Sequence, residues 1–152
     1  MRIDYAEVSA LLRQSRSGAL GTYSVAMAGF PFVSAVPFVA DALGRPAFLL
    51  SGLAEHTRNL LADPRASLLV TDGEGVDLAQ ARLTLIGRVS PVDLDEAARQ
   101  RFVRYSPESA LYLELGDFRF FRMEPVRARF IGGFGRMGWV DAEPPAVVLD
   151  PA

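Results

Sequence analysis

Apolar residues recur along this chain at two spacings, every second residue in some segments and every third or fourth residue in others. The first spacing is typical of β-strands and the second of helices. Short strands are predicted at residues 19–25, 32–39, 46–50, 66–71, 82–89, 118–124 and 126–131. Helices are predicted near residues 4–15, in a short segment that stops at Asp63-Pro64, from Asp93 or Asp95 to Tyr105, and from Pro107 to Leu113.

The order of these elements indicates the fold class. Short strands outnumber helices, and the two kinds of element do not alternate strictly, which favours an antiparallel β-barrel with helical decoration over a doubly wound parallel sheet. Pro37 lies inside the apolar run 32–39, and a proline cannot donate a hydrogen bond to a neighbouring strand. We therefore expect this strand at a sheet edge, at a bulge, or open to a ligand.

Length and composition predict one domain with a real core. The chain has 152 residues, 50% of them hydrophobic and 22% charged, and this length is typical of a single domain. No linker or internal repeat divides the sequence. We expect residues 1–140 to form the domain and residues 141–152, which contain three prolines, to form a C-terminal arm.

Charge and residue usage exclude several classes of chemistry. There is no cysteine, which excludes disulfides, thiolate metal sites and cysteine nucleophiles. All 16 basic residues are arginines, so Schiff-base chemistry and a Walker-type lysine are excluded. The net charge of −2 argues against a nucleic-acid surface. No apolar run approaches the roughly 20 residues that span a bilayer, and no secretory segment opens the chain, so we expect a cytoplasmic protein.

One polar cluster stands between two apolar runs, in residues 51–59. It contains the only histidine, His56, and the only asparagine, Asn59, with Ser51, Thr57 and Arg58 beside them. Hydroxyls, an imidazole and a guanidinium around a helix start are the groups that bind phosphate. This pattern predicts the phosphate end of a nucleotide-type cofactor site. The alternative is an ordinary helix start with a solvated polar face.

Several segments, taken in order, resemble the FMN-binding split barrel of pyridoxamine 5'-phosphate oxidase-like proteins, over roughly residues 5–140. The branch containing haem-utilisation proteins is the most similar, on the segments His56-Thr-Arg-Asn59 and Gly132-Gly-Phe-Gly-Arg136. The wider family resemblance rests on Gly18-Ala-Leu-Gly-Thr22, Pro31-Phe-Val-Ser-Ala-Val-Pro-Phe38, Leu50-Ser51, Asp63-Pro-Arg-Ala-Ser-Leu68 and Ala81-Arg-Leu-Thr-Leu-Ile-Gly87.

This resemblance implies an antiparallel six-stranded split barrel that forms a homodimer, with FMN in a cleft between the two subunits. By position, Ser34, Val36 and Pro37 would lie along the flavin ring. Ser51 and Thr57 would contact the phosphate.

The resemblance assigns four further positions. His56 stands where many relatives place a lysine, and Arg58 would be a second phosphate contact. Arg82 falls at a polar flavin contact, although a surface-facing arginine is equally consistent with its place in the strand. Trp139 would match an aromatic position near the flavin, often supplied by the partner subunit, although a core or interface role is the commoner use of such a residue.

The predicted function is that of an FMN-dependent oxidoreductase acting on a small molecule. The alternatives are a haem-binding or haem-degrading protein, a flavin-binding module without turnover, or a deazaflavin protein. No side chain is a convincing general acid or base, so we assign no catalytic residue, and we expect no metal-ion site. Because no histidine follows His56, haem ligation by an imidazole would fall to His56 itself.

Overall fold

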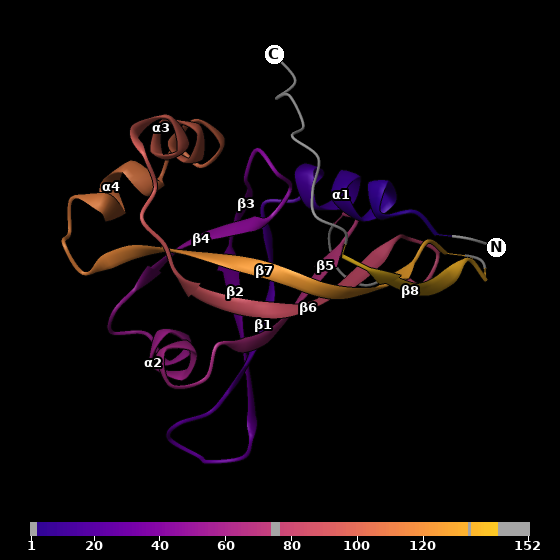
Figure 1. Ribbon diagram of the computed structural model, residues 1–152, viewed down its shortest axis with the longest axis horizontal. Coiled ribbons are helices and arrows are strands. Elements are labelled where there is room, and N and C mark those ends of the chain that lie inside the picture. Colours follow the sequence, from indigo (N-terminus) through magenta and orange to yellow (C-terminus); the bar gives the residue numbers. More distant parts are fainter. Residues whose placement is uncertain (1–2, 74–76, 134, 143–152) are drawn as a thin grey trace.

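The computed structural model describes residues 3–73, 77–133 and 135–142. Figure 1 labels the elements, which follow one another along the chain with four helices set among eight strands in this described part. Their bounds are α1 Tyr5–Gln14, β1 Ser17–Tyr23, β2 Pro31–Pro37, β3 Val39–Ala40, β4 Pro46–Ser51, α2 Glu55–Ala62, β5 Arg65–Thr71, β6 Arg82–Pro91, α3 Glu96–Tyr105, α4 Ser109–Leu113, β7 Phe118–Ile131 and β8 Met137–Asp141.

The strands form one antiparallel sheet in the order β2-β1-β5-β6-β7-β4-β3, and β8 adds to β7. The two ends of this order are neighbours in the chain, because β2 ends at Pro37 and β3 begins at Val39. Between them, the Phe38 amide donates to the Arg16 carbonyl at 3.0 Å. The sheet therefore curls round on itself, which confirms the predicted barrel class, with eight strands instead of six in the described residues.

Pro37 is explained by the position of its strand. β2 pairs only with β1 within the sheet order, so it is an edge strand, and Pro37 lies opposite Ser17 at its end. A missing amide donor is tolerated at such a position. Of the three alternatives that Pro37 left open, the structure shows the sheet edge.

The two strands predicted at 118–124 and 126–131 are a single strand, β7. The pairing register between β6 and β7 shifts between Ile86 and Gly87, where Gly87 faces Pro125. A Cβ at Gly87 would lie 2.3 Å from the Glu124 carbonyl oxygen, so only glycine fits. The bulge lets β7 continue through Pro125, the residue at which the sequence predicts that one strand ends and another begins.

The barrel interior and an outer layer form two separate apolar clusters. Strand β4 contributes to both, since Phe48 and Leu50 point into the barrel while Ala47 and Leu49 lie under Phe102 of α3. This is why β4 reads as a continuous apolar run instead of an alternating one. Figure 1 shows α3 and α4 together at one end of the long strands, with α1 above the sheet and α2 below it.

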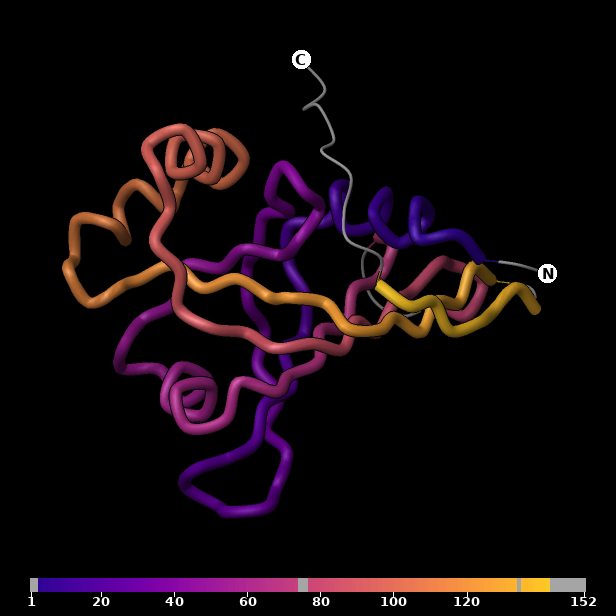
Figure 2. The backbone as a smooth tube through the Cα atoms, in the orientation of Figure 1, coloured from indigo at the N-terminus to yellow at the C-terminus, as the bar shows by residue number. Residues whose placement is uncertain are grey.

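The β1–β2 hairpin extends away from the body of the molecule. Figure 2 shows its loop as the protruding violet segment. Val25, Met27 and Phe30 in this loop are exposed.

The described helices are short. The longest, α1 and α3, have ten residues each. In residues 3–73, 77–133 and 135–142, none of them has the length and apolar character needed to cross a bilayer.

Candidate functional site

A pocket of about 270 Å³ lies where β2, β4 and α2 meet the α3–α4 segment. Its wall is mostly apolar, and one imidazole contributes to it. The lining residues that matter for the chemistry are Val36 and Pro37 from β2, Leu50 and Ser51 from β4, His56 from α2, and Tyr112 and Phe118 from the α4–β7 region. The structure thus brings together four residues predicted from the sequence, at positions 36, 37, 51 and 56.

His56 is held in place by a fifth predicted residue. Its Nδ1 atom lies 3.1 Å from Oγ of Ser34 on β2. Burial lowers the pKa of the half-buried imidazole below the usual histidine value, because desolvation disfavours the charged form. At pH 7 the ring is therefore neutral, and with Nδ1 engaged by Ser34, Nε2 is the nitrogen available to a ligand.

The predicted phosphate corner is filled by the protein's own polar contacts. Thr57 is buried, and its Oγ1 donates to the Ser51 carbonyl at 2.6 Å. Oγ of Ser51 donates to Oδ2 of Asp117 at 2.9 Å. Both hydroxyls thus donate to protein oxygens, and the Asp117 carboxylate would repel a phosphate here. Arg58 is exposed and is not part of the pocket lining.

Asn59 has a structural task that the sequence did not reveal. Its side chain is fully buried, donating to Oγ1 of Thr22 at 3.0 Å and accepting from the Val25 amide at 2.9 Å. These bonds fix α2 to the end of β1. The helix start has no side-chain cap, since its N-cap is Ala54.

Two predicted residues lie far from the pocket within one chain. Arg82 begins β6 and pairs with Ile131, whereas Phe118, at the opposite end of β7, lines the pocket. Trp139 on β8 is 47% exposed, and the guanidinium of Arg127 lies 4.7 Å from the centre of its ring. The sequence predicts that a glycine-rich bend brings Phe134 and Trp139 against the barrel or the partner subunit, but Phe134 lies outside the described residues.

The chain matches a known family over almost its whole length. Residues 4–144 match the family model described as CREG, beta-barrel. The chain belongs to the CREG β-barrel family. It is 39% identical over 130 residues to the chloroplastic non-canonical heme oxygenase HOZ of Arabidopsis thaliana, covering 84% of this chain and 40% of that protein. It is 32% identical over 116 residues to heme oxygenase HutZ of Vibrio cholerae, covering 71% and 65%.

Solved structures place this CREG β-barrel chain among split barrels. A heme binding protein from Mycobacterium smegmatis matches with a TM-score of 0.79 and 32% identity, over 93% of this chain and 59% of that one. A putative pyridoxamine 5'-phosphate oxidase from Listeria innocua has the same fold at 18% identity, with a TM-score of 0.63 and coverage of 84% and 98%. The predicted split-barrel fold and its haem-related branch are confirmed.

The prediction of FMN as the cofactor is wrong. Three relatives of this CREG β-barrel chain that are at least 30% identical to it are named for haem: HOZ, HutZ and the mycobacterial protein. The structure gives a physical reason for the same correction. The Ser51 and Thr57 hydroxyls, on which the flavin prediction depended, donate to Asp117 and to the Ser51 carbonyl and so are not available to a phosphate. The chain spans less than two thirds of the length of either curated relative.

Two residues of the pocket wall could not be predicted from the sequence. Tyr112 of α4 and Phe118 of β7 stack with ring centres 5.0 Å apart at an interplanar angle of 27°, and both line the pocket. Their spacing of six residues across a turn fits neither helical nor strand periodicity, so no periodic signal pairs them.

Proposed function

We propose that this protein binds haem in the pocket that contains His56. The observation that carries the proposal is that the chain's only histidine is half-buried and held at Nδ1 by Ser34, in a wall that is mostly apolar. Burial lowers the pKa of this imidazole, which favours the neutral form that binds iron. Haem needs an apolar surface for its macrocycle and a ligand for its iron, and a neutral imidazole is a common ligand. The haem names of relatives with 30% identity or more support this choice.

The residues present fit such a group. An iron-bound histidine commonly donates its second ring N–H to a neighbouring oxygen, which fixes the ring's orientation. Oγ of Ser34 at 3.1 Å from Nδ1 can take this role. Val36, Leu50 and Phe118 offer the apolar contacts. Bound haem would supply a redox-active iron, and these residues would orient it and exclude water.

The size of the pocket supports the homodimer that the sequence predicts. A volume of about 270 Å³ lies just below the roughly 300–1,000 Å³ usual for ligand sites. A four-ring macrocycle would extend beyond it, so a second surface is needed to cover the rest. We propose that a second copy of the chain provides that surface.

The outer face of the barrel has the character needed for self-association. Along one row of paired residues, Val33, Gly21, Ser67 and Ile86 follow one another from β2 to β6. Val33 and Ile86 are exposed. Other exposed apolar side chains on the strands of this sheet are Tyr23, Leu69, Val126, Met137 and Trp139. Extended apolar patches on a protein surface mark contact sites.

Haem titration followed by the Soret band tests the proposed site. Wild-type protein is expected to shift the band at one haem per chain, and His56→Ala is expected to lose the ligand-dependent part of the shift. Leu61→Ala, an exposed change on the same helix, is the matched control. Tyr112→Phe checks the other side chain of the wall that can ligate iron. A full Soret shift that survives His56→Ala would place the haem elsewhere.

Self-association is tested separately by light scattering. Ile86→Asp puts a charge at the β6 end of this row of paired residues and is expected to give a monomer. Glu55→Gln, an exposed change on α2 outside this row of residues, serves as the control. A wild-type protein that is monomeric at all concentrations would contradict the proposed homodimer.

Haem degradation is the second candidate function, favoured because two relatives are named heme oxygenases. Its test is an aerobic incubation of the haem complex with a reductant such as ascorbate. Loss of the Soret band with release of an open-chain tetrapyrrole supports degradation. A stable band under the same conditions supports haem binding alone.

A further inference from the structure

The negative charge of the His56 pocket is confined to the side formed by α4. Among the described lining residues, Glu108 at the N-cap of α4 is the only one that is charged at pH 7. Its Oε1 accepts from Oγ of Ser106 at 2.9 Å. Hydrogen bonds from its own backbone amide and from Ser106 lower the pKa of the carboxyl, because they favour the ionised form. The fold thus fixes an anion at this side of the pocket.

A second carboxylate lies on the same side, at the other end of α4. Asp117 stands between α4 and β7, where its carbonyl accepts from the Gly52 amide at 2.7 Å and its Oδ2 accepts from Oγ of Ser51 at 2.9 Å. Ser51 lines the pocket and pairs with Phe118, the residue after Asp117. One carboxylate therefore precedes α4 and the other follows it, with the stacked rings of Tyr112 and Phe118 between them in the chain.

The side of the pocket formed by β2 and the start of α2 differs. Its described lining residues are Ala35, Val36 and Pro37 from β2, with Ala54 and His56 from the α2 region, and none of them is acidic. Ala35 and Pro37 are exposed. A charged group of a ligand could therefore stay hydrated on this side without meeting a carboxylate from the lining.

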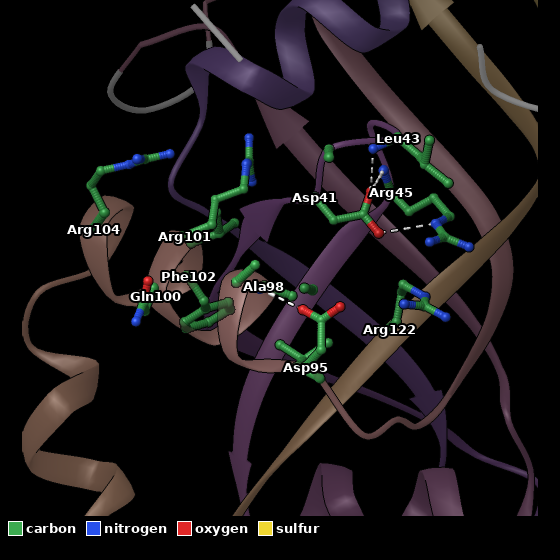
Figure 3. Close-up of a pocket in the computed structure, with 15 residues that line it drawn as sticks. Asp41, Leu43, Arg45, Asp95, Ala98, Gln100, Arg101, Phe102, Arg104 and Arg122 are labelled. Carbon is green, nitrogen blue, oxygen red and sulfur yellow. Dashed lines mark hydrogen bonds and ion pairs between the residues drawn. The ribbon is translucent and has the colours of Figure 1, made fainter. Parts of the chain in front are cut away.

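The pocket also offers no guanidinium to a carboxylate, since no arginine is among its described lining residues. The neighbouring cleft of about 560 Å³, which shares Phe102 with the pocket, is different. Figure 3 shows the four arginines of its described lining, Arg45, Arg101, Arg104 and Arg122. A ligand carboxylate on the α4 side of the His56 pocket would meet two like charges and no compensating cation from the lining.

Haem has a charge distribution that fits this arrangement. Its two propionates share one edge of the macrocycle, and the other edges carry only methyl and vinyl groups. We propose that the α4 side selects haems by this distribution: an uncharged edge lies against Tyr112 and Phe118, and the propionates point towards β2 and solvent. A porphyrin with a carboxylate on each of its four rings would bring one beside Glu108 or Asp117 in any orientation. This inference rests on the haem site proposed above and adds its substrate class, haems with two carboxylates on one edge.

Absorbance titration with three iron porphyrins tests the selection. Where protohaem has two vinyl groups, mesohaem has two ethyl groups and coprohaem has two further propionates. All three carry the same iron, so ligation by His56 is the same. We expect mesohaem to bind within about threefold of protohaem, and coprohaem to bind at least about tenfold more weakly. Equal binding of coprohaem overturns the selection and leaves the haem site intact, whereas failure of all three to bind removes the haem site and this inference with it.

A double variant locates the selection on the α4 side. Glu108→Gln with Asp117→Asn removes both charges but keeps oxygens that can accept the same hydrogen bonds. It should raise the affinity for coprohaem at least about tenfold and change that for protohaem less than about threefold, and Glu108→Gln alone should give part of this increase. Glu96→Gln with Asp93→Asn, at exposed positions outside the lining, is the control with the same net charge. An equal increase in both double variants, or none in either, overturns the proposal.

Discussion

The His56 pocket and a larger cleft of about 560 Å³ between α3 and the β3–β4 hairpin lie on two sides of one residue, Phe102, which lines both. In the His56 pocket, the polar groups nearest the wall bond to one another: Ser34 with His56, Thr57 with the Ser51 carbonyl. In a small hollow beside that cleft, lined by Arg13, Arg16 and Tyr105, the Nη1 and Nη2 atoms of Arg13 are buried without a hydrogen-bond partner among the described residues. Proximity of polar residues therefore says little about a ligand, because such residues can satisfy one another's hydrogen bonds.

The same contrast explains why the phosphate prediction failed. The cluster at 51–59 has the right residue types, but three of its members hold the structure together. Thr57 and Asn59 are buried, and Ser51 bonds to Asp117. Of the remaining two, Arg58 is exposed outside the pocket and His56 lines it.

The largest predicted effect is the loss of stability when the buried Asn59 side chain is removed. Asn59→Ala removes both bonds of a buried amide and leaves the Val25 amide and the Thr22 hydroxyl without their partner. Two such losses cost about 2–4 kcal/mol of unfolding free energy. Urea denaturation measures it, and Leu61→Ala on the same helix, an exposed change, should cost less than about 0.5 kcal/mol. An equally small loss in Asn59→Ala would contradict the assigned role.

The second effect sharpens the role of Ser34. Ser34→Ala leaves the imidazole in place but removes the oxygen that orients it, so haem affinity should fall about tenfold, the lower end of what such supporting bonds contribute. Ser90→Ala, an exposed serine on β6, should have no effect. Absorbance titration gives both dissociation constants. If Ser34→Ala weakens binding as much as His56→Ala does, the serine would be a direct ligand contact instead of a positioning residue.

The sequence predicted most of the barrel and part of the site. The strands were found from alternation, and a sheet edge was one of the three positions that the missing amide of Pro37 left open. The family resemblance assigned Ser34, Pro37 and His56 to one cofactor site. These features depend on local pattern or on matched motifs.

Long-range partners could not be predicted. Asp117 is 66 residues from Ser51 in the chain, yet its carboxylate determines the charge of the corner. Tyr112 and Phe118 reach the pocket only because α4 folds back over the end of β4. Arg13 reads as an ordinary basic residue in the last turn of α1, and its lack of a partner becomes visible only in three dimensions.

The third effect is on pH dependence. Burial lowers the pKa of His56, so the imidazole remains neutral at pH 7, and protons compete with iron only below the ordinary histidine value of about 6.5. We expect the ratio of haem affinities, wild type to His56→Ala, to be constant from about pH 8 to 7 and to shrink by less than about tenfold by pH 5.5. Spectrophotometric titrations at each pH measure it. A ratio that falls already between pH 8 and 7 would mean that the pKa is raised.

The smallest effect is expected at a third kind of polar contact, one that is paired and exposed. Nη2 of Arg65 lies 2.6 Å from Oδ2 of Asp63, and this pairing lowers the pKa of Asp63 from 3.8 to about 2. The stability that it provides is present above pH 3.8 and is lost as the pH falls through about 2. Because the pair is solvated, Asp63→Asn should hardly change the melting temperature at pH 7. It should make the acid-induced decrease slightly shallower, a difference that 1 M salt removes, and Asp93→Asn should leave the acid profile as it is. A loss at pH 7 as large as that of Asn59→Ala would show that exposed pairing, and not only buried pairing, stabilises this barrel.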